Sequence, residues 1–276
     1  ASKAFSCKEI YRIVAEEGLG IDVVSGGELY TAHNAGFPME KVFFHGNNKT
    51  DEEVALALSL SVGRIVVDNL EELRRLDALA AIAGRQQAIL LRVKPGIDAH
   101  THEFIRTGQI DSKFGFALET GEAMAAVKAA LQAEHLHLTG IHCHIGSQIF
   151  DREPFVAAGD VMTAFAADIL DETGVTLTEI NLGGGFGIQY SEQDDPRPAS
   201  EILADVWGAV RTLASSRGLP EPKLIVEPGR SIAGPAGCTL YTIGARKEIP
   251  GVRTYLSVDC EMCKSKQKLP DLFFLF

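Results

Sequence analysis

The feature that most constrains the fold is a regular alternation of short apolar runs, rich in Val and Ile, with longer amphipathic segments. Such alternation predicts β-α units and a mostly parallel sheet, and near-continuous apolar runs are typical of strands buried on both faces. Seven strands are predicted, at residues 21–24, 41–45, 64–68, 88–93, 138–144, 177–182 and 223–227. Helices are predicted at residues 6–17, 27–35, 51–61, 69–83, 120–133, 155–173 and 199–216.

Seven strands are one short of a closed (β/α)8 barrel of the TIM type, and we expect the missing first strand to precede Ala1. The alternation stops after Glu227, where residues 229–235 are loop-like and residues 238–245 and 252–258 are predicted to be β without intervening helices. We therefore predict an α/β barrel over residues 1–233 that lacks most of strand one. The start of a truncated β domain is predicted over residues 234–276, and its last residues, 260–276, show no periodicity.

The composition, with 46% hydrophobic and 23% charged residues, is typical of a soluble globular protein. The net charge of −11 disfavours binding to nucleic acids or anionic membranes, because an acidic surface repels polyanions. No apolar run approaches the roughly 18 residues of a membrane span, and the first residues lack the apolar core of a signal peptide. Five scattered cysteines suit a reducing compartment, so we expect a cytoplasmic protein.

A glycine-rich stretch, NLGGGFGI at residues 181–188, follows the sixth predicted strand. Its consecutive glycines, Gly183, Gly184 and Gly185, leave backbone N–H groups uncovered, so an anion such as phosphate could bind the main chain there. On the glycines alone, a tight turn that needs positive φ is favoured over a phosphate cradle. The spacing excludes the dinucleotide motif, because Ile188 stands where its third glycine would fall, and no P-loop motif occurs.

The position of the glycines in the barrel favours the phosphate cradle over a plain turn. Barrels often hold phosphate in the loops after strands seven and eight. If the absent strand is counted as the first, the glycines follow strand seven and EPGR, residues 227–230, follows strand eight. Arg230 can pair bidentately with phosphate, although a lone arginine is more often part of a surface ion pair. Glu227 ends a buried strand, where it could form a salt bridge with an arginine or pair with a protonated ring nitrogen of a cofactor.

Four further side chains could carry chemistry. His142 and His144 lie two residues apart on one predicted strand and therefore face the same side. A metal pair is the main alternative there, but Asp68 is the one possible further ligand at a strand end, and His45 lies in a loop, so we favour a buried, hydrogen-bonded role for His142. Ser147 could donate to phosphate or be a simple loop serine. Lys3 could be a desolvated nucleophile at the barrel mouth or a solvated charge.

Five stretches resemble, in order, the motifs of the fold type III pyridoxal-phosphate decarboxylases. They are ASKAF at residues 1–5, IDVVSGGEL at 21–29, HCHIGSQ at 142–148, GGGFG at 183–187 and EPGR at 227–230. Within that family, FHGNNKT at 44–50 and HTHEFIRTGQIDSKFGF at 100–116 are similar to the diaminopimelate decarboxylases rather than to ornithine or arginine decarboxylases or alanine racemases. The resemblance covers residues 1–259.

The resemblance implies a cofactor, pyridoxal 5′-phosphate, and a role for each matching residue. Lys3 would bond covalently to the cofactor aldehyde, His144 would stack on its ring, and Glu227 would keep the pyridine nitrogen protonated. The implied cofactor-binding set is completed by Asp22, Ser25, Ser147, Gly183, Gly184, Gly185, Pro228, Gly229 and Arg230, of which Arg230 would also contact substrate. The implied reaction is decarboxylation of meso-2,6-diaminopimelate to L-lysine and CO2 in lysine biosynthesis, by a homodimer.

The sequence departs from that family after residue 259, where CEMCKSKQKLPDLFFLF replaces a glycine-rich stretch with Asn-Pro. The late cysteine motif and tyrosine, which in the family reach the partner subunit's site, do not occur in the chain, and we interpret the Cys260 and Cys263 pair as accidental. The alternatives are therefore a decarboxylase of ornithine, arginine or lysine, or a catalytically incomplete or noncatalytic pyridoxal-phosphate-binding protein. A metal-dependent hydrolase that uses His142 and His144 is a further alternative.

Overall fold

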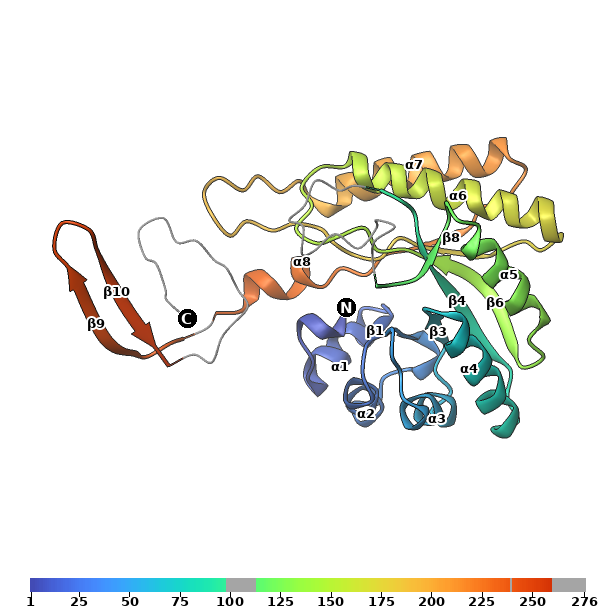
Figure 1. Cartoon of the computed structure of the whole chain (residues 1–276), viewed down its shortest axis with the longest axis horizontal. Coiled ribbons are helices and arrows are strands. Elements are labelled where there is room, and N and C mark those ends of the chain that lie inside the picture. The colour runs from blue at the N-terminus through green and yellow to red at the C-terminus, as the bar shows by residue number, and fades with distance from the viewer. Residues whose placement is uncertain (98–112, 239, 260–276) are drawn as a thin grey trace. The chain divides into compact units, whose positions relative to one another are not determined.

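The computed structural model describes residues 1–97, 113–238 and 240–259, and its largest part is a parallel sheet surrounded by helices (Figure 1). The strand order is β1-β2-β3-β4-β6-β7-β8, with β5 paired to β4. The strands are β1 (Ile21–Val23), β2 (Val42–Phe44), β3 (Arg64–Val67), β4 (Gln87–Lys94), β5 (Phe116–Ala117), β6 (Leu136–His142), β7 (Glu179–Asn181) and β8 (Lys223–Ile225). The predicted α/β class, a partial barrel of the TIM type, is confirmed.

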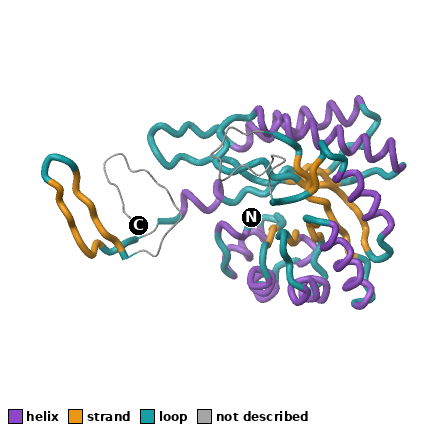
Figure 2. Tube along the Cα trace, viewed as in Figure 1, coloured by secondary structure: helices purple, strands orange, loops and turns teal. Residues whose placement is uncertain are grey.

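The helices lie on the outer side of the sheet, and the strands are gathered between them (Figure 2). They are α1 (Lys8–Glu16), α2 (Gly26–Asn34), α3 (Asp51–Ser59), α4 (Leu70–Ile82), α5 (Glu122–Gln132), α6 (Glu153–Thr173) and α7 (Ala199–Ser216). Local chemistry fixes several of their ends. Thr50 and Glu53 form a reciprocal capping box at the start of α3, and the side chain of Asn69 caps α4. The core is made of strand residues such as Ile65, Leu91 and Ile141, which are fully buried.

Parallel pairing brings the carboxyl ends of the strands to one edge of the sheet. The backbone N–H of His45 donates to Val23, that of Cys143 to Asn181, and that of Leu182 to Ile225, at 2.8, 2.8 and 3.0 Å. At the amino ends, Arg64 of β3 donates two hydrogen bonds to Glu179 of β7, at 2.9 and 2.8 Å. This ion pair joins strands that are not neighbours in the sheet and closes the end away from the predicted site.

Three details differ from the predictions. Strand β5 was not predicted, because two residues are too short to show a periodicity. Residues 229–235, predicted to be loop, contain the short helix α8 (Arg230–Ala233) and the 3-10 turn η4 (Gly234–Ala236). The first predicted β segment of the second domain was placed too early, because the strand β9 (Ile243–Ile249) begins five residues after residue 238.

The described residues divide into two units. The first comprises residues 1–188 and 195–235, apart from the undescribed 98–112, and the second comprises 189–194, 236–238 and 240–259. Within the second, β9 pairs with β10 (Arg253–Val258) in an antiparallel hairpin, whose turn contains Pro250 and Gly251, at φ +73°. No helix among the described residues is long and apolar enough to cross a lipid bilayer. Most of the motif at 100–116 lies outside the described residues, and so does the Cys260 and Cys263 pair.

Candidate active site

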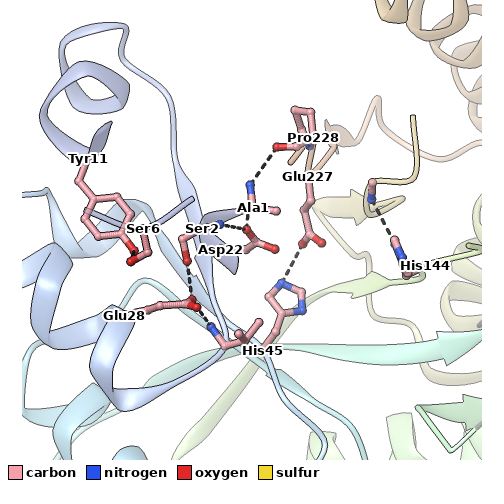
Figure 3. Close-up of polar contacts among 12 residues, drawn as sticks. Ala1, Ser2, Ser6, Tyr11, Asp22, Glu28, His45, His144, Glu227 and Pro228 are labelled. Carbon is pink, nitrogen blue, oxygen red and sulfur yellow. Dashed lines mark hydrogen bonds and ion pairs between the residues drawn. The ribbon is translucent and has the colours of Figure 1, made fainter. Parts of the chain in front are cut away.

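Glu227 lies at the centre of the polar groups that meet at the carboxyl ends of the strands (Figure 3). It follows β8 by two residues, and its side chain is only 10% exposed. Its Oε1 atom accepts a hydrogen bond from Nδ2 of Asn181 at 2.7 Å and lies 2.8 Å from Nε2 of His45. Its Oε2 atom lies 3.4 Å from Nε2 of His142. The carboxylate is thus held by two imidazoles and an amide, rather than by an arginine salt bridge.

These neighbours decide the charge of the carboxylate. Burial alone would raise the pKa of Glu227, but the electrostatic interaction with His45 and His142 holds that pKa well below its ordinary value. Glu227 is therefore ionised at neutral pH. A buried, ionised carboxylate at this position can pair with a cationic group that enters the barrel mouth.

His142, on β6, is 1% exposed, as the prediction of a buried histidine requires. Burial lowers the pKa of His142 to about 4, so the ring is neutral at neutral pH. Its predicted hydrogen bond is reduced to a contact: Nε2 lies 3.4 Å from Oε2 of Glu227, and among the described residues neither ring nitrogen has an aligned partner. Nε2 of His45 is likewise without an aligned partner among the described residues, so the two imidazoles meet Glu227 as close electrostatic contacts, and Asn181 supplies its hydrogen bond.

His144 was predicted to lie on the strand, but β6 ends at His142 and His144 follows it. Its Nδ1 accepts a hydrogen bond from the backbone N–H of Gly184 at 3.3 Å (Figure 3). Burial, together with the positive charges of Lys3 and Arg92, lowers the pKa of His144 to about 3. The imidazole is therefore neutral, its proton lies on Nε2, and its plane is fixed against the glycine loop.

The three glycines form a bare stretch of main chain packed between neighbouring loops. Gly183 and Gly185 have φ of +68° and +113°, conformations that side chains rarely adopt. A Cβ atom on Gly183 would lie 2.6 Å from the carbonyl oxygen of Cys143, and one on Gly184 would overlap the carbonyl oxygen of Glu227. The positive φ of a tight turn and the side-chain-free surface of a cradle therefore occur together.

Two side chains beside the glycine loop are joined by a hydrogen bond. Nη2 of Arg230, at the start of α8, donates to Oγ of Ser147 at 3.0 Å. Arg230 is exposed and Ser147 is half-buried, so the guanidinium and the hydroxyl are both accessible from the mouth of the barrel. A guanidinium, a hydroxyl and exposed N–H groups are the donors that protein sites use to hold phosphate.

Lys3 lies in a short 3-10 turn, η1 (Ser2–Ala4), that is fastened to the ends of β1 and β8. The backbone nitrogen of Ala1 donates to the carbonyl of Pro228 at 2.9 Å and lies 3.0 Å from Oδ1 of Asp22 (Figure 3). The same Oδ1 accepts from the backbone N–H of Ser2 at 3.1 Å. The side chain of Lys3 is exposed, and its charge is near enough to lower the pKa of His144.

The remaining predicted residues shape this segment. A Cβ atom on Gly229 would lie 2.9 Å from the Cβ of Ala1, so glycine lets the two segments approach. Ser25 caps helix α2 by accepting from the backbone N–H of Glu28 at 3.3 Å. Glu28 itself accepts from Ser2 Oγ and, at 2.8 Å, from the backbone N–H of Val24 (Figure 3). The predicted residues therefore come together, with Ser25 placed as a helix cap.

Sequence reasoning missed Arg92, a buried charge in the apolar strand β4. Its Nη1 lies 3.7 Å from Oδ1 of Asp68, and its guanidinium lies over the ring of Phe114, 4.2 Å from the ring centre. The electrostatic effect of Arg92 lowers the pKa of both His142 and His144. An arginine inside ILLRVK, residues 89–94, was a signal that could have found it, because a strand buried on both faces rarely keeps a charge without a use.

The alternative of a metal pair made by His142 and His144 is disfavoured, because Nδ1 of His144 is engaged by the backbone N–H of Gly184. A different trio has the spacing of a metal site: the ligand atoms of His45, His142 and Glu227 all lie within 4.8 Å of one another. His45 follows β2, His142 lies on β6 and Glu227 follows β8, and all three are largely buried.

Comparisons with known proteins give one family. The sequence model of the pyridoxal-dependent decarboxylases, pyridoxal binding domain, matches residues 1–234. Diaminopimelate decarboxylase of Bacillus subtilis is 50% identical over 259 residues, which are 94% of this chain and 59% of that protein. The enzyme of Mycobacterium tuberculosis is 46% identical over 267 residues, 94% of this chain and 60% of that one.

Solved structures agree with this result. Diaminopimelate decarboxylase of M. jannaschii in complex with L-lysine has a TM-score of 0.83 and 35% identity over 94% of this chain and 58% of that chain. The Helicobacter pylori enzyme with L-lysine has a TM-score of 0.82 and 30% identity over 94% and 62%. The chain spans about three fifths of the length of the curated relatives, 59% for the Bacillus subtilis enzyme.

Proposed function

The chain belongs to the pyridoxal-dependent decarboxylases through their pyridoxal-binding domain, and from that premise we propose that it holds pyridoxal 5′-phosphate at the barrel mouth. We propose further that the protein decarboxylates meso-2,6-diaminopimelate to L-lysine and CO2. The carrying observation is the convergence of a bare glycine loop, the Arg230 and Ser147 pair, and the buried, ionised Glu227. These groups fit a molecule with an anion at one end and a protonated ring nitrogen at the other.

The phosphate end would be held by the loops after β6, β7 and β8. Arg230 supplies a permanent positive charge and two parallel N–H donors, and Ser147 is placed beside it at 3.0 Å. In the glycine loop, the N–H groups of Gly183 and Gly184 already donate to Oδ1 of Asn181 and Nδ1 of His144, so the N–H of Gly185 is the donor that we assign to phosphate.

The ring end would be held by Glu227 and His144. Glu227 is ionised because His45 and His142 lower its pKa, so it can keep a proton on the ring nitrogen. When bound, pyridoxal phosphate supplies an electron sink for the pair of electrons left by loss of CO2, and that sink requires the protonated nitrogen. His144 is neutral, and its plane is fixed by Gly184, so it can stack on the ring without adding a positive charge.

Lys3 would supply the amine that bonds to the cofactor aldehyde. Asp22 and Glu28 hold the turn that carries it, which ties its position to the end of β1. The relatives point to diaminopimelate as substrate, and two of the solved structures contain L-lysine. Ornithine, arginine and lysine are the alternative substrates, and a homodimer in the cytoplasm is part of the proposal.

The first experiment is reaction of the purified protein with pyridoxal phosphate, followed by borohydride reduction and peptide mapping. We expect one modified lysine, Lys3. Lys3→Ala should abolish the adduct, and Lys8→Ala, an exposed lysine on α1, should leave it unchanged. Modification spread over surface lysines would contradict the proposed site. Release of CO2 from meso-diaminopimelate, compared with ornithine, arginine and lysine, then tests the substrate, and adduct formation without any release would favour a noncatalytic binding protein.

A metal-dependent hydrolase is the second candidate, favoured by the spacing of His45, His142 and Glu227 within 4.8 Å. Metal analysis of the purified protein tests it. One equivalent of bound metal, lost in His45→Ala, would support the hydrolase. Purified protein with negligible metal that still forms the Lys3 adduct would exclude it.

A further inference from the structure

Gln148, in the loop after β6, has a backbone conformation that needs explanation. Its φ is +60°, and Ser61 is the only other non-glycine residue with positive φ among the described residues. This left-handed conformation carries an energetic cost for any residue with a side chain. Such a cost is tolerated where surrounding contacts fix the residue, so the contacts of Gln148 indicate what the strain is used for.

The side-chain amide of Gln148 binds both backbone groups of Ile188. Its Nε2 donates to the carbonyl oxygen of Ile188 at 2.7 Å, and its Oε1 accepts from the N–H of Ile188 at 3.2 Å. One amide thus replaces the neighbouring strand that would otherwise satisfy Ile188, which is 7% exposed. Glutamate could accept from the N–H, but at neutral pH it has no donor for the carbonyl.

The same loop is joined to the glycine stretch by main-chain contacts. Ile149 forms an isolated parallel bridge with Phe186, in which its N–H donates to Gly185 at 2.9 Å and its carbonyl accepts from Gly187 at 3.0 Å. A Cβ on Gly187 would lie 2.7 Å from the ring of Phe150. The two loops therefore touch along their length, and Gln148 fixes the far end of the contact.

The contact extends to the loop after β8. A Cβ on Gly234 would overlap Cδ1 of Ile188, so Ile188 packs directly against the segment that follows Arg230. On the other side, Ser147 precedes Gln148 and accepts the hydrogen bond of Arg230. The Gln148 amide is therefore bonded to a residue that packs between the glycine loop and the arginine segment.

We propose that Gln148 is a positioning residue that sets the spacing between Ser147, the glycine loop and Arg230, and thereby prepares a cradle for phosphate. The inference rests on the proposed function for the identity of the phosphate. Gln148 does not itself bind the ligand: its amide is occupied by Ile188.

The test compares binding of pyridoxal phosphate with binding of pyridoxal, which has the same aldehyde and ring but no phosphate. Gln148→Glu and Gln148→Ala should weaken pyridoxal phosphate at least about tenfold and leave pyridoxal within about twofold. Gln148→Gly removes the amide and also relieves the φ strain, so it should fold and show the same selective loss. The control is Gln132→Ala, an exposed glutamine at the end of α5, which should change neither affinity.

Hydrogen exchange supplies a readout that is independent of the cofactor. In each Gln148 variant the amide of Ile188 should exchange faster, and that of Tyr11, in the distant α1, should not. Faster exchange at Ile188 with unchanged pyridoxal phosphate affinity in Gln148→Gly would overturn the proposal, as would an equal loss for both compounds.

Failure of the proposed function would give a different result. If the wild-type protein binds neither compound, the proposed function fails, and the variants are compared by titration with inorganic phosphate. Loss of about tenfold in phosphate affinity would then support the positioning role. Equal phosphate affinity, or no binding by the wild type, would overturn it.

Discussion

Replacement of Gly184 by alanine should damage the site through a single steric contact. The added Cβ would overlap the backbone carbonyl oxygen of Glu227, so a main-chain segment must move. Gly184 does not have positive φ, and alanine therefore adds no dihedral strain there. The remaining cost is overpacking, which is typically about 1–3 kcal/mol of unfolding free energy.

The displaced atom belongs to Glu227, so the effect should also reach the ligand. We expect Gly184→Ala to lower the urea midpoint without changing the slope, and to weaken pyridoxal phosphate at least about tenfold. Gly208→Ala is the matched control: Gly208 lies within α7, and an added Cβ there would meet no atom within 4 Å. That control should stabilise the protein by about 0.5–1 kcal/mol, because alanine is the better helix former.

The reasoning would be refuted if Gly184→Ala unfolded at the wild-type urea concentration and bound cofactor with wild-type affinity. The glycine loop would then have room for a Cβ atom at Gly184, which its close packing against Glu227 should not allow. Equal destabilisation by Gly208→Ala would point instead to a general sensitivity of the fold to substitution.

Three further predictions concern buried charges. The pKa of His142 is about 4 in the folded chain and near 6.5 when unfolded, so the unfolded state binds more protons between these values. The contribution of His142 to the free energy of unfolding is therefore complete above pH 6.5 and falls by about 3 kcal/mol as the pH drops to 4. His142→Gln cannot take up this proton, so the free energy of unfolding from urea melts should fall less between pH 7 and pH 4.5 in the variant than in the wild type. Lys49→Met should cost about 3–5 kcal/mol by leaving Glu72 buried without its ammonium, and adding Glu72→Leu should recover most of it in the same melts. Asp22→Asn should reduce the yield of the Lys3 adduct in peptide mapping, because it weakens the acceptor that holds the turn, and an unchanged yield would refute that role.

The sequence predicted the barrel well because its signals are local. Strand β3, predicted at 64–68, is found at Arg64–Val67, and helix α7, predicted at 199–216, is found at Ala199–Ser216. Strong periodicity over a long helix leaves little freedom at its ends. The errors fall where the signal is short or non-local. Helix α8 has four residues and follows Gly229, whose close approach to Ala1 no local pattern records.

The site was predicted in part for the same reason. Parallel strands place their carboxyl ends together, so His144, the glycines and Glu227 could be brought to one edge from the sequence. The pairing of Glu227 with His45 could not, because it joins residues that follow β2 and β8, and only the curvature of the sheet brings them together. For the same reason Arg92 and Asp68 were not recognised as an interacting pair.

The charges of the assembled site allow one orientation of the proposed cofactor. Arg230 is the positive group beside the glycine loop, and Glu227 is the ionised carboxylate between His45 and His142. A phosphate turned toward Glu227 would place two anions together in a buried environment, and a ring cation turned toward Arg230 would oppose two positive charges. Removing that negative charge in Glu227→Gln should therefore weaken binding of pyridoxal, which has the ring but no phosphate, whereas Arg230→Gln should weaken only pyridoxal phosphate.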